Sequence, residues 1–414
     1  MMKRYPHRLW AAVLAGLLLL TSFTACLSEE SATDGTTLSA DTTAEETIPL
    51  TSKETTTVVS DTEAAVTVTP ETVPVTEPVT EPETEPVTIF ETEPETAPET
   101  EAETEAPPEV YTITLSFIGD CMLASYKGEY GKGKFNTVAD QLPASHFFEK
   151  MYPIFSEDDF TIANCENVFT DRDLTEKEKD HDPAYWYKSP TKNAAIFKEG
   201  SIEILSIANN HISDYGSDGK KDTKAALTAQ GLLWGNESNS VIVEKYGIRI
   251  GIVMCGLWSS YQTDRAVRLI DALEEETDYQ IVYYHGGTER KYTPDAWRVT
   301  ASEKMVDAGA DLVIGGHPHV LQPMTTYKGC DILYSMGNFL FGGSKKSDRF
   351  TIVYQKVLTV SEGVILEESY NIIPVYEYEG SSTTTWQPYP MEAGSADYEA
   401  VMAFMRGERK SPKP

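Results

Sequence analysis

The sequence predicts an α/β fold for the part of the chain that follows residue 109, and three observations lead to this prediction. Short apolar, β-branched segments recur along this part. Helical segments lie between several of them. Clusters of acids, amides and imidazoles come directly after several of the apolar segments. Because loops at strand ends carry the chemistry of α/β folds, these clusters are the first candidates for a functional site.

The charge of the chain is concentrated before residue 110. The 414 residues carry a net charge of −31, and residues 27–109 hold 22 acidic residues and one lysine. The folded part is therefore only moderately acidic, at −13, once the three basic residues before Cys26 are counted. A nucleic-acid partner is excluded, because phosphate backbones are bound by basic faces. Five cysteines are too few for a disulfide scaffold of this length.

Residues 1–25 are predicted to be a lipoprotein signal peptide. Basic residues precede an apolar run from Trp10 to Leu20, which is too short for an ordinary spanning helix. Phe23-Thr24-Ala25-Cys26 resembles the bacterial lipobox, with Phe in place of the usual Leu. That resemblance implies cleavage before Cys26, diacylation of its thiol and an extracytoplasmic, lipid-anchored protein on the bacterial cell membrane. The alternative is plain secretion with an incidental cysteine.

Residues 26–109 are predicted to be a disordered stalk rich in Thr, Glu and Pro. Proline recurs every few residues between Glu71 and Pro108, which blocks helices and favours extended polyproline II. The segment has too little apolar surface to form a core. It would lift a folded domain away from the membrane.

The first three strands of the folded part each lead into polar residues. A strand at 111–118 ends in Gly119-Asp120, and one at 160–163 is followed by Asn164-Cys165-Glu166. A third strand at 202–207 runs into Asn209-Asn210-His211, before a helix at 218–230. Loop 171–190 carries Tyr185-Trp186-Tyr187 either toward a ligand or against its own domain.

The next elements deliver imidazoles. A hairpin at 241–255 and a helix at 266–275 precede a strand at 279–284, which ends at His285. A helix from about 293 to 308 leads to a short strand at 312–314. Two glycines then allow a sharp turn into His317-Pro318-His319, which places two potential metal ligands on one loop.

The last strands are predicted at 331–334, which is followed by Asn338, and at 350–358 and 364–378. Residues 381–414 are predicted to be a polar C-terminal tail with a short helix at 398–406. Cys121 and Cys165 are each adjacent to a candidate ligand. If their strands are neighbours, the thiols approach disulfide range; otherwise they are simply buried.

Residues of the types that bind metals therefore come directly after several predicted strands. If these strand ends meet at one sheet edge, as expected, they form a metal site. The set consists of Asp120, Glu166, Asn210, His211, His285, His317 and His319.

With these residues laid out, the domain at 110–380 resembles the capsule-synthesis CapA family of the calcineurin-like metallophosphoesterase superfamily. The motifs that carry the resemblance are F-I-G-D, A-N-C-E-N, S-I-A-N-N-H-I-S-D-Y-G, H-G-G-T-E, G-G-H-P-H-V-L-Q-P and Y-S-M-G-N-F, in the family's order. The resemblance implies a four-layer α-β-β-α sandwich with a two-metal site at one sheet edge.

The resemblance also implies roles for individual residues. Asp120 is similar to the first metal ligand and Glu166 to the bridging carboxylate, while Asn210 is similar to the ligand amide. His211 is similar to the general acid. The remaining imidazole ligands correspond to His285, His317 and His319, and residues that contact the substrate or support the ligands correspond to Asn164, Asn209, Glu289 and Asn338.

The sequence departs from the superfamily at one ligand. Ordinary members begin Asp-x-His, whereas Cys121 and Met122 follow Asp120 here. One nitrogen ligand is missing, so either one or two ions are expected. Mixed nitrogen and oxygen ligands favour Mn, Fe or Zn.

The resemblance implies a protein of capsule or poly-γ-glutamate synthesis or export. One hypothesis is a metal-dependent hydrolase that acts on a phosphoester or an anionic polymer. The other is a non-catalytic polymer-binding or export-scaffold protein, which the missing histidine favours. A capsule synthesis and export complex would then be its partner, and a passive wall spacer with a decayed site is the third alternative.

Overall fold

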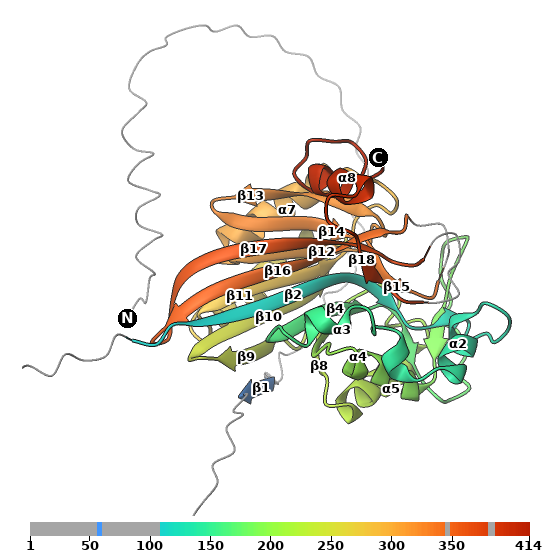
Figure 1. Ribbon diagram of the computed structural model, residues 1–414. Coiled ribbons are helices and arrows are strands. Elements are labelled where there is room, and N and C mark those ends of the chain that lie inside the picture. Colours follow the sequence, from blue (N-terminus) through green and yellow to red (C-terminus); the bar gives the residue numbers. More distant parts are fainter. Residues whose placement is uncertain (1–55, 60–107, 344–347, 380–385) are drawn as a thin grey trace, which may run out of the picture. The chain divides into compact units, whose positions relative to one another are not determined.

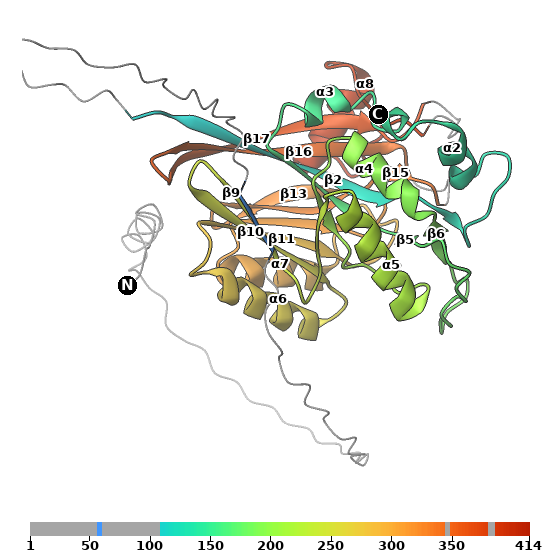
Figure 2. The same ribbon diagram turned by 90° about the horizontal axis from the view of Figure 1, so that it is seen from below.

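The computed structural model describes residues 56–59, 108–343, 348–379 and 386–414. Two β-sheets pack face to face, and helices cover their outer faces (Figures 1 and 2). The predicted four-layer α-β-β-α sandwich is thereby confirmed. The predicted signal peptide, Cys26 and most of the predicted stalk lie outside the described residues. Within the described part of the chain, no helix is both long and apolar enough to cross a membrane.

The first sheet has a parallel centre and antiparallel edges. Strands β10, β11, β12 and β14 run parallel to one another, while β9 and β13 pair antiparallel with their neighbours. Strand β1, a short segment within the predicted stalk, pairs parallel with β9. In spatial order the strands are β1 (Thr56–Val59), β9 (Val241–Lys245), β10 (Ile248–Gly256), β11 (Tyr279–His285), β12 (Leu312–Gly316), β14 (Cys330–Met336) and β13 (Leu321–Tyr327).

The second sheet joins a parallel half to an antiparallel half at its central strand β2. Strands β4, β7 and β8 extend the sheet parallel to β2, whereas β16 pairs with it antiparallel. In spatial order the strands are β18 (Tyr389–Pro390), β17 (Val364–Tyr376), β16 (Phe350–Ser361), β2 (Tyr111–Met122), β4 (Phe160–Cys165), β7 (Ile204–Ser206) and β8 (Leu233–Gly235), and β15 (Asn338–Phe341) also pairs with β2. A small third sheet consists of β3 (Ser125–Tyr126), β6 (Tyr187–Ser189) and β5 (Val168–Phe169).

Helices cover the outer faces of both sheets. On the first sheet, α6 (Ser260–Leu273) and α7 (Ala296–Asp307) lie side by side (Figure 2). On the second sheet lie α2 (Phe135–Gln141), α3 (Tyr152–Phe155), α4 (Ala195–Glu199), α5 (Gly216–Ala229) and the 3-10 helices Ala144–His146 and Thr191–Ala194. Helix α6 buries Thr263, Ala266, Ile270 and Leu273, which is the spacing of one helical face.

The main core lies between the two sheets. Phe117 of β2, Ile281 of β11 and Tyr354 of β16 are fully buried in it. Separate apolar clusters lie between each sheet and its helices. The central strands are buried on both faces, which explains why they appear in the sequence as continuous apolar runs.

Several elements differ in extent from the sequence prediction. Strand β2 continues through Asp120 because it pairs there with β4 and β15, so this carboxylate lies within a strand rather than beyond it. His285 is likewise the last residue of β11. Helix α8 (Ala396–Met405) matches the short helix predicted at 398–406, but the segment is not simply a polar tail, because Val401 and Phe404 are buried in the main core.

Cys121 and Cys165 are register partners on the adjacent parallel strands β2 and β4, and both are free thiols. Burial raises the pKa of Cys121 well above its ordinary value and that of Cys165 to about 12. Both are therefore protonated and unreactive at neutral pH.

We expect alkylation to separate the buried cysteines from Cys330, which is partly exposed. Iodoacetamide should label Cys330 in the native protein, whereas Cys121, Cys165 and Cys255 should react only after unfolding. Peptide mass mapping before and after denaturant measures this. A Cys121–Cys165 disulfide in the non-reduced protein would contradict the free thiols of the structure.

Candidate metal centre

The candidate site lies where strand ends from both sheets meet. Asp120 comes from the end of β2, and Glu166 follows β4 directly. From the facing sheet, His285 ends β11 and His317 follows β12. All four side chains are buried, with exposed fractions between 0% and 7%. The structure thus brings together residues that are up to 197 positions apart in the sequence.

Asn164 holds the two carboxylates in place. Its side-chain amide lies 2.9 Å from Asp120 Oδ1 and 3.5 Å from Glu166 Oε2, and donates to both. The same nitrogen lies 3.0 Å from His285 Nδ1. Asp120 Oδ2 also accepts a 2.9 Å hydrogen bond from the backbone N–H of His317. The position of one carboxylate therefore depends on groups from both sheets.

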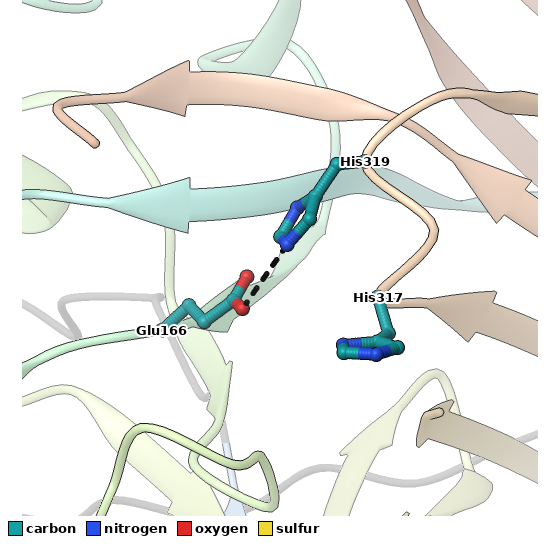
Figure 3. A group of neighbouring side chains, drawn as sticks. All are labelled: Glu166, His317 and His319. Carbon is teal, nitrogen blue, oxygen red and sulfur yellow. Dashed lines mark ion pairs between the residues drawn. The ribbon is translucent and has the colours of Figure 1, made fainter. Parts of the chain in front are cut away.

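Three imidazoles face these carboxylates. His285 lies 3.4 Å from each acid, through Nδ1 to Asp120 Oδ1 and through Nε2 to Glu166 Oε1. His319 bridges the same pair at 3.5 Å and 3.7 Å. His317 Nδ1 lies 3.1 Å from His285 Nε2. Figure 3 shows Glu166 and His319 pointing toward each other, with His317 on the same loop.

Two overlapping groups of these residues have ligand atoms within 4.8 Å of one another. One group is Glu166, His317 and His319, and the other is Asp120, Glu166 and His285. Glu166 belongs to both, which is the arrangement expected of a bridging carboxylate. A buried His/Asp/Glu cluster of this kind could bind a metal ion.

One buried oxygen of Glu166 favours a bound cation over a metal-free site. Glu166 Oε1 is buried and accepts no hydrogen bond from the described residues. Its partners are the ion pairs to His285 Nε2 at 3.4 Å and His319 Nε2 at 3.7 Å, so an ion at this position would add a closer compensation for the burial of its charge. The donor set of carboxylate oxygens and imidazole nitrogens is also one that divalent transition metals prefer.

The loop after β12 has a strained backbone. His317 and His319 have φ angles of +93° and +55°, in a region that side chains other than glycine seldom adopt. Gly316, just before them, passes so close to the acids that a methyl group there would lie 2.7 Å from Asp120 Oδ1. Gly316 is therefore required because no side chain fits beside Asp120. The left-handed backbone of His317 and His319 then brings their two imidazoles over the carboxylates.

Electrostatic coupling shifts the pKa values of the cluster in opposite directions. Burial alone would lower the pKa of His285 and His319, but Glu166 and Asp120 raise them to about 9 and about 10. Burial would raise the pKa of Asp120, but His285 and His319 hold it well below its usual range. Burial and the two neighbouring histidines keep the pKa of His317 well below 6.5, so its ring is neutral.

His211 lies beside this cluster rather than within either group. Its Nδ1 is 2.8 Å from Asp214 Oδ2, and the other oxygen of Asp214 lies 2.7 Å from Lys179 Nζ. Asn209 Oδ1 accepts hydrogen bonds from the backbone N–H groups of His211 and Ile212, and this fixes the turn. The His-x-x-Asp spacing was the sequence signal for the Asp214 contact, which the sequence analysis missed.

The remaining predicted site residues divide into contacting and peripheral ones. Asn210 Oδ1 lies 3.0 Å from His285 Nε2, and Asn338 Oδ1 lies 2.8 Å from His319 Nδ1. Asn209 donates to Asn164 Oδ1 at 3.0 Å, so it supports the carboxylates indirectly. Glu289 is exposed, yet its charge contributes to the raised pKa of His319.

Two aromatic side chains form walls of the site. Trp258 is 42% exposed and lies edge-on against His317, with 4.8 Å between ring centroids. Tyr187, from the predicted loop 171–190, lies edge-on against His211, with 5.0 Å between ring centroids. Tyr187 is thus the aromatic of that loop which lies toward the site. No sequence signal identified Trp258, because a single aromatic after a strand is common in cores.

Met122 occupies the position of the missing first-motif histidine. It is fully buried in an apolar cluster with Ala124, Tyr187 and Phe341. Its thioether is a soft, weak ligand for the metals that carboxylates prefer. The ligand set is therefore short of a nitrogen at this position.

Comparisons with known proteins show which family the chain resembles in sequence. Residues 114–343 match the family model of the bacterial capsule synthesis protein PGA_cap. The chain is similar to the PGA biosynthesis protein CapA of Bacillus subtilis (strain 168), with 27% identity over 58% of this chain and 67% of that protein. It is also similar to the capsule biosynthesis protein CapA of Bacillus anthracis, with 26% identity over 65% and 68% of the two chains.

A more distant relative shares a smaller part. A probable polyglutamine synthesis accessory protein of Mycobacterium tuberculosis (strain ATCC 25618 / H37Rv) is 28% identical over 33% of this chain and 44% of its own length.

The pKa shifts predict how the metal-free protein responds to pH. Unfolded imidazoles titrate near pH 6.5, so the protons held by His285 and His319 stabilise the fold fully below that pH, and this contribution is lost as the pH rises to about 9 and about 10. His317 acts oppositely, because below about pH 6.5 only its unfolded form is protonated. The chelator-treated protein should therefore be most stable near pH 6.5.

Calorimetric Tm values of the chelator-treated protein between pH 5 and 10 check this expectation. The fall in Tm above pH 7 should be smaller in His319→Gln, which lacks one of the two raised groups. A wild-type Tm that stays level or rises between pH 7 and 9 would contradict it.

Proposed function

The chain belongs to the family of bacterial capsule synthesis proteins described as PGA_cap, and we propose that it is a metal-dependent hydrolase of this capsule or poly-glutamate system. The observation that carries the proposal is the buried pair Asp120 and Glu166 among three imidazoles, in which Glu166 Oε1 faces two ring nitrogens at 3.4 Å and 3.7 Å but accepts no hydrogen bond from the described residues. A bound metal ion would give that oxygen a closer partner than either imidazole does.

We assign the metal ligands to Asp120, Glu166, Asn210, His285, His317 and His319. Mn, Fe or Zn fits these ligands, as one or two ions. Bound there, such ions would supply Lewis-acid activation of a substrate oxygen. Asn164 and Asn338 would keep the ligands oriented, since each bonds directly to a ligand side chain.

His211 is assigned as the general acid. Asp214 binds its Nδ1 at 2.8 Å, which fixes the ring orientation and leaves Nε2 to carry a proton to the leaving group. Lys179 and the backbone N–H of Tyr187 both bond to Asp214, so that carboxylate is held firmly. Trp258 and Tyr187 would restrict the entry of water from two sides.

The substrate class is a phosphoester or an amide-linked anionic polymer. The names of the relatives, which refer to PGA biosynthesis and capsule biosynthesis, support the polymer. The protein would act outside the cytoplasm, tethered to the membrane by lipid on Cys26 and raised from it by residues 26–109. A capsule synthesis or export complex is the proposed partner.

The second candidate is a non-catalytic protein that binds the polymer or supports its export. The observation that favours it is Met122, which stands where a nitrogen ligand would complete the usual two-metal set. Under this proposal the metal would bridge the acidic protein and the acidic polymer rather than activate a nucleophile.

Metal content and turnover test the first candidate together. Wild-type protein should bind at least one divalent ion by elemental analysis and should hydrolyse a phosphodiester, whereas His317→Ala should lose metal and at least 100-fold in kcat/KM. His181→Ala, which removes an exposed imidazole from loop 171–190, is the matched control and should keep both the bound metal and the turnover.

Wild-type protein that binds no metal would overturn both candidates. Bound metal without turnover of any phosphodiester or glutamate polymer would leave the binding protein as the function.

The acid role of His211 has its own signature. His211→Asn should lower kcat by about 10²–10⁴ for a substrate with a poor leaving group, because the departing oxygen then needs a proton. A p-nitrophenyl ester should suffer far less, since its leaving group departs as the anion. Metal content should stay unchanged, and equal losses for both substrates would remove the assignment.

A further inference from the structure

A cavity of about 470 Å³ lies next to the metal centre, and the ligand assignments do not use it. Its volume falls within the range of about 300–1,000 Å³ that is common for ligand sites. Residues of four separate segments line it. They include Tyr126 of β3, Tyr185 before β6, Tyr187 of β6, and Lys132 and Lys134 before α2.

The aromatic wall of the cavity reaches His211, which lies beside the metal centre. The rings of Tyr185 and Tyr187 stack with an interplanar angle of 13° and centroids 6.4 Å apart. Tyr126 lies edge-on against both, at 6.2 Å and 6.4 Å. Tyr187 in turn contacts His211 at 5.0 Å. A chain lying along this wall would therefore arrive beside the proposed general acid.

Close packing fixes the shape of the cavity. Gly342 lines it where a methyl group would lie 2.4 Å from the carbonyl oxygen of Ala124 and 2.7 Å from Phe135 Cβ, so the backbone is pressed against the domain. Trp386, which also lines the cavity, is 4% exposed and packs edge-on against Phe135 at 5.6 Å. The cavity is thus partly open to solvent, and packed residues of the folded domain form this side of it.

The charge of the cavity is opposite to that of the chain. Two lysines and no acidic residue are among its described lining residues. Lys132 is exposed, and Lys134 pairs with Glu129 at 2.5 Å. Nearby, Lys127 lies over the Trp186 ring at 4.8 Å. In a folded part with a net charge of −13, an aromatic cavity that presents Lys132, while Glu129 offsets the charge of Lys134, is locally suited to an anion.

We propose that this cavity binds a segment of a glutamate polymer, in which carboxylates meet Lys132 and Lys134 while the chain packs along the tyrosine wall. The choice of this polymer rests on the proposed function. Ammonium groups bind carboxylates through charge-assisted hydrogen bonds, and tyrosine faces contact methylene groups and amide planes. Both kinds of contact repeat along such a polymer, so the cavity would hold it while the next residues reach the metal centre.

Binding of a fluorescent γ-linked glutamate oligomer to the purified full chain tests the proposal. Fluorescence anisotropy should show binding that weakens about five- to tenfold in Lys132→Glu and in Tyr185→Ala, and that also weakens as salt is raised. Lys328→Glu is the matched control. It makes the same charge change on an exposed lysine in the turn before β14. That turn lies at the end of β14 opposite to Met336, after which the chain continues to the site residue Asn338.

Metal content and circular dichroism of each variant should equal those of the wild type, since none of these residues belongs to the ligand set. Each titration is run with the metal-loaded and the chelator-treated protein. Loss of binding in Lys132→Glu with unchanged metal content supports the cavity. If Lys328→Glu weakens oligomer binding equally, the effect is one of net charge alone, and the cavity proposal is contradicted.

Two further outcomes separate this proposal from the proposed function. Oligomer binding that His317→Ala abolishes and Lys132→Glu leaves unchanged would place the polymer at the metal alone and overturn the cavity. If the wild-type protein shows no turnover but Lys132→Glu still weakens oligomer binding, the cavity proposal is supported and the hydrolase proposal is contradicted. Inorganic polyphosphate that competes more strongly than the oligomer would overturn the carboxylate assignment in favour of a phosphate polymer.

Discussion

Two buried carboxylates must be compensated, and much of the site follows from this constraint. Asp120 and Glu166 are fully buried, where an uncompensated negative charge would cost several kcal/mol. Without metal, His285 and His319 supply the compensation, which is why their pKa values rise to about 9 and about 10. A divalent ion would replace those protons by a fixed charge. Proton binding and metal binding at this edge are therefore competing solutions to one electrostatic problem.

The sandwich supplies the rigidity that such compensation needs. Asp120 and Glu166 belong to one sheet, while His285 and the His317 loop belong to the other, so the charges face each other only if the sheets stay in register. The main core between the sheets fixes that relation through fully buried side chains such as Phe117 and Tyr283. Tyr283 also donates a 2.7 Å hydrogen bond to the carbonyl of Ile118, directly across the interface and two residues before Asp120. The stability of the core and the geometry of the site are consequently linked.

The sequence predicted the elements and the clustering of ligand types better than it predicted their contacts. Apolar runs revealed the central strands, and polar residues after them identified Asp120, Glu166, His285 and His317 as neighbours at one edge. The strand ends were placed too early at Asp120, because pairing with β15 extends β2 and no local pattern announces that partner. The support of Asp214 by the backbone N–H of Tyr187 depends on loop 171–190 folding back toward His211, and the burial of α8 depends on sheet faces far away in the chain. Such long-range contacts leave little trace in a single sequence.

The acidity of the chain gives the neighbouring lysines a meaning that they would lack in a basic protein. A polymer of carboxylates is repelled by most of a folded part that carries a net charge of −13, so it can approach closely only where cations are exposed. Lys132 and Lys134 provide such a place, and the tyrosines beside them continue to His211. Repulsion elsewhere would keep the polymer from adhering along the stalk and domain, and would leave the cavity as its preferred contact. Selectivity would then come as much from the charges that exclude the polymer as from the few that hold it.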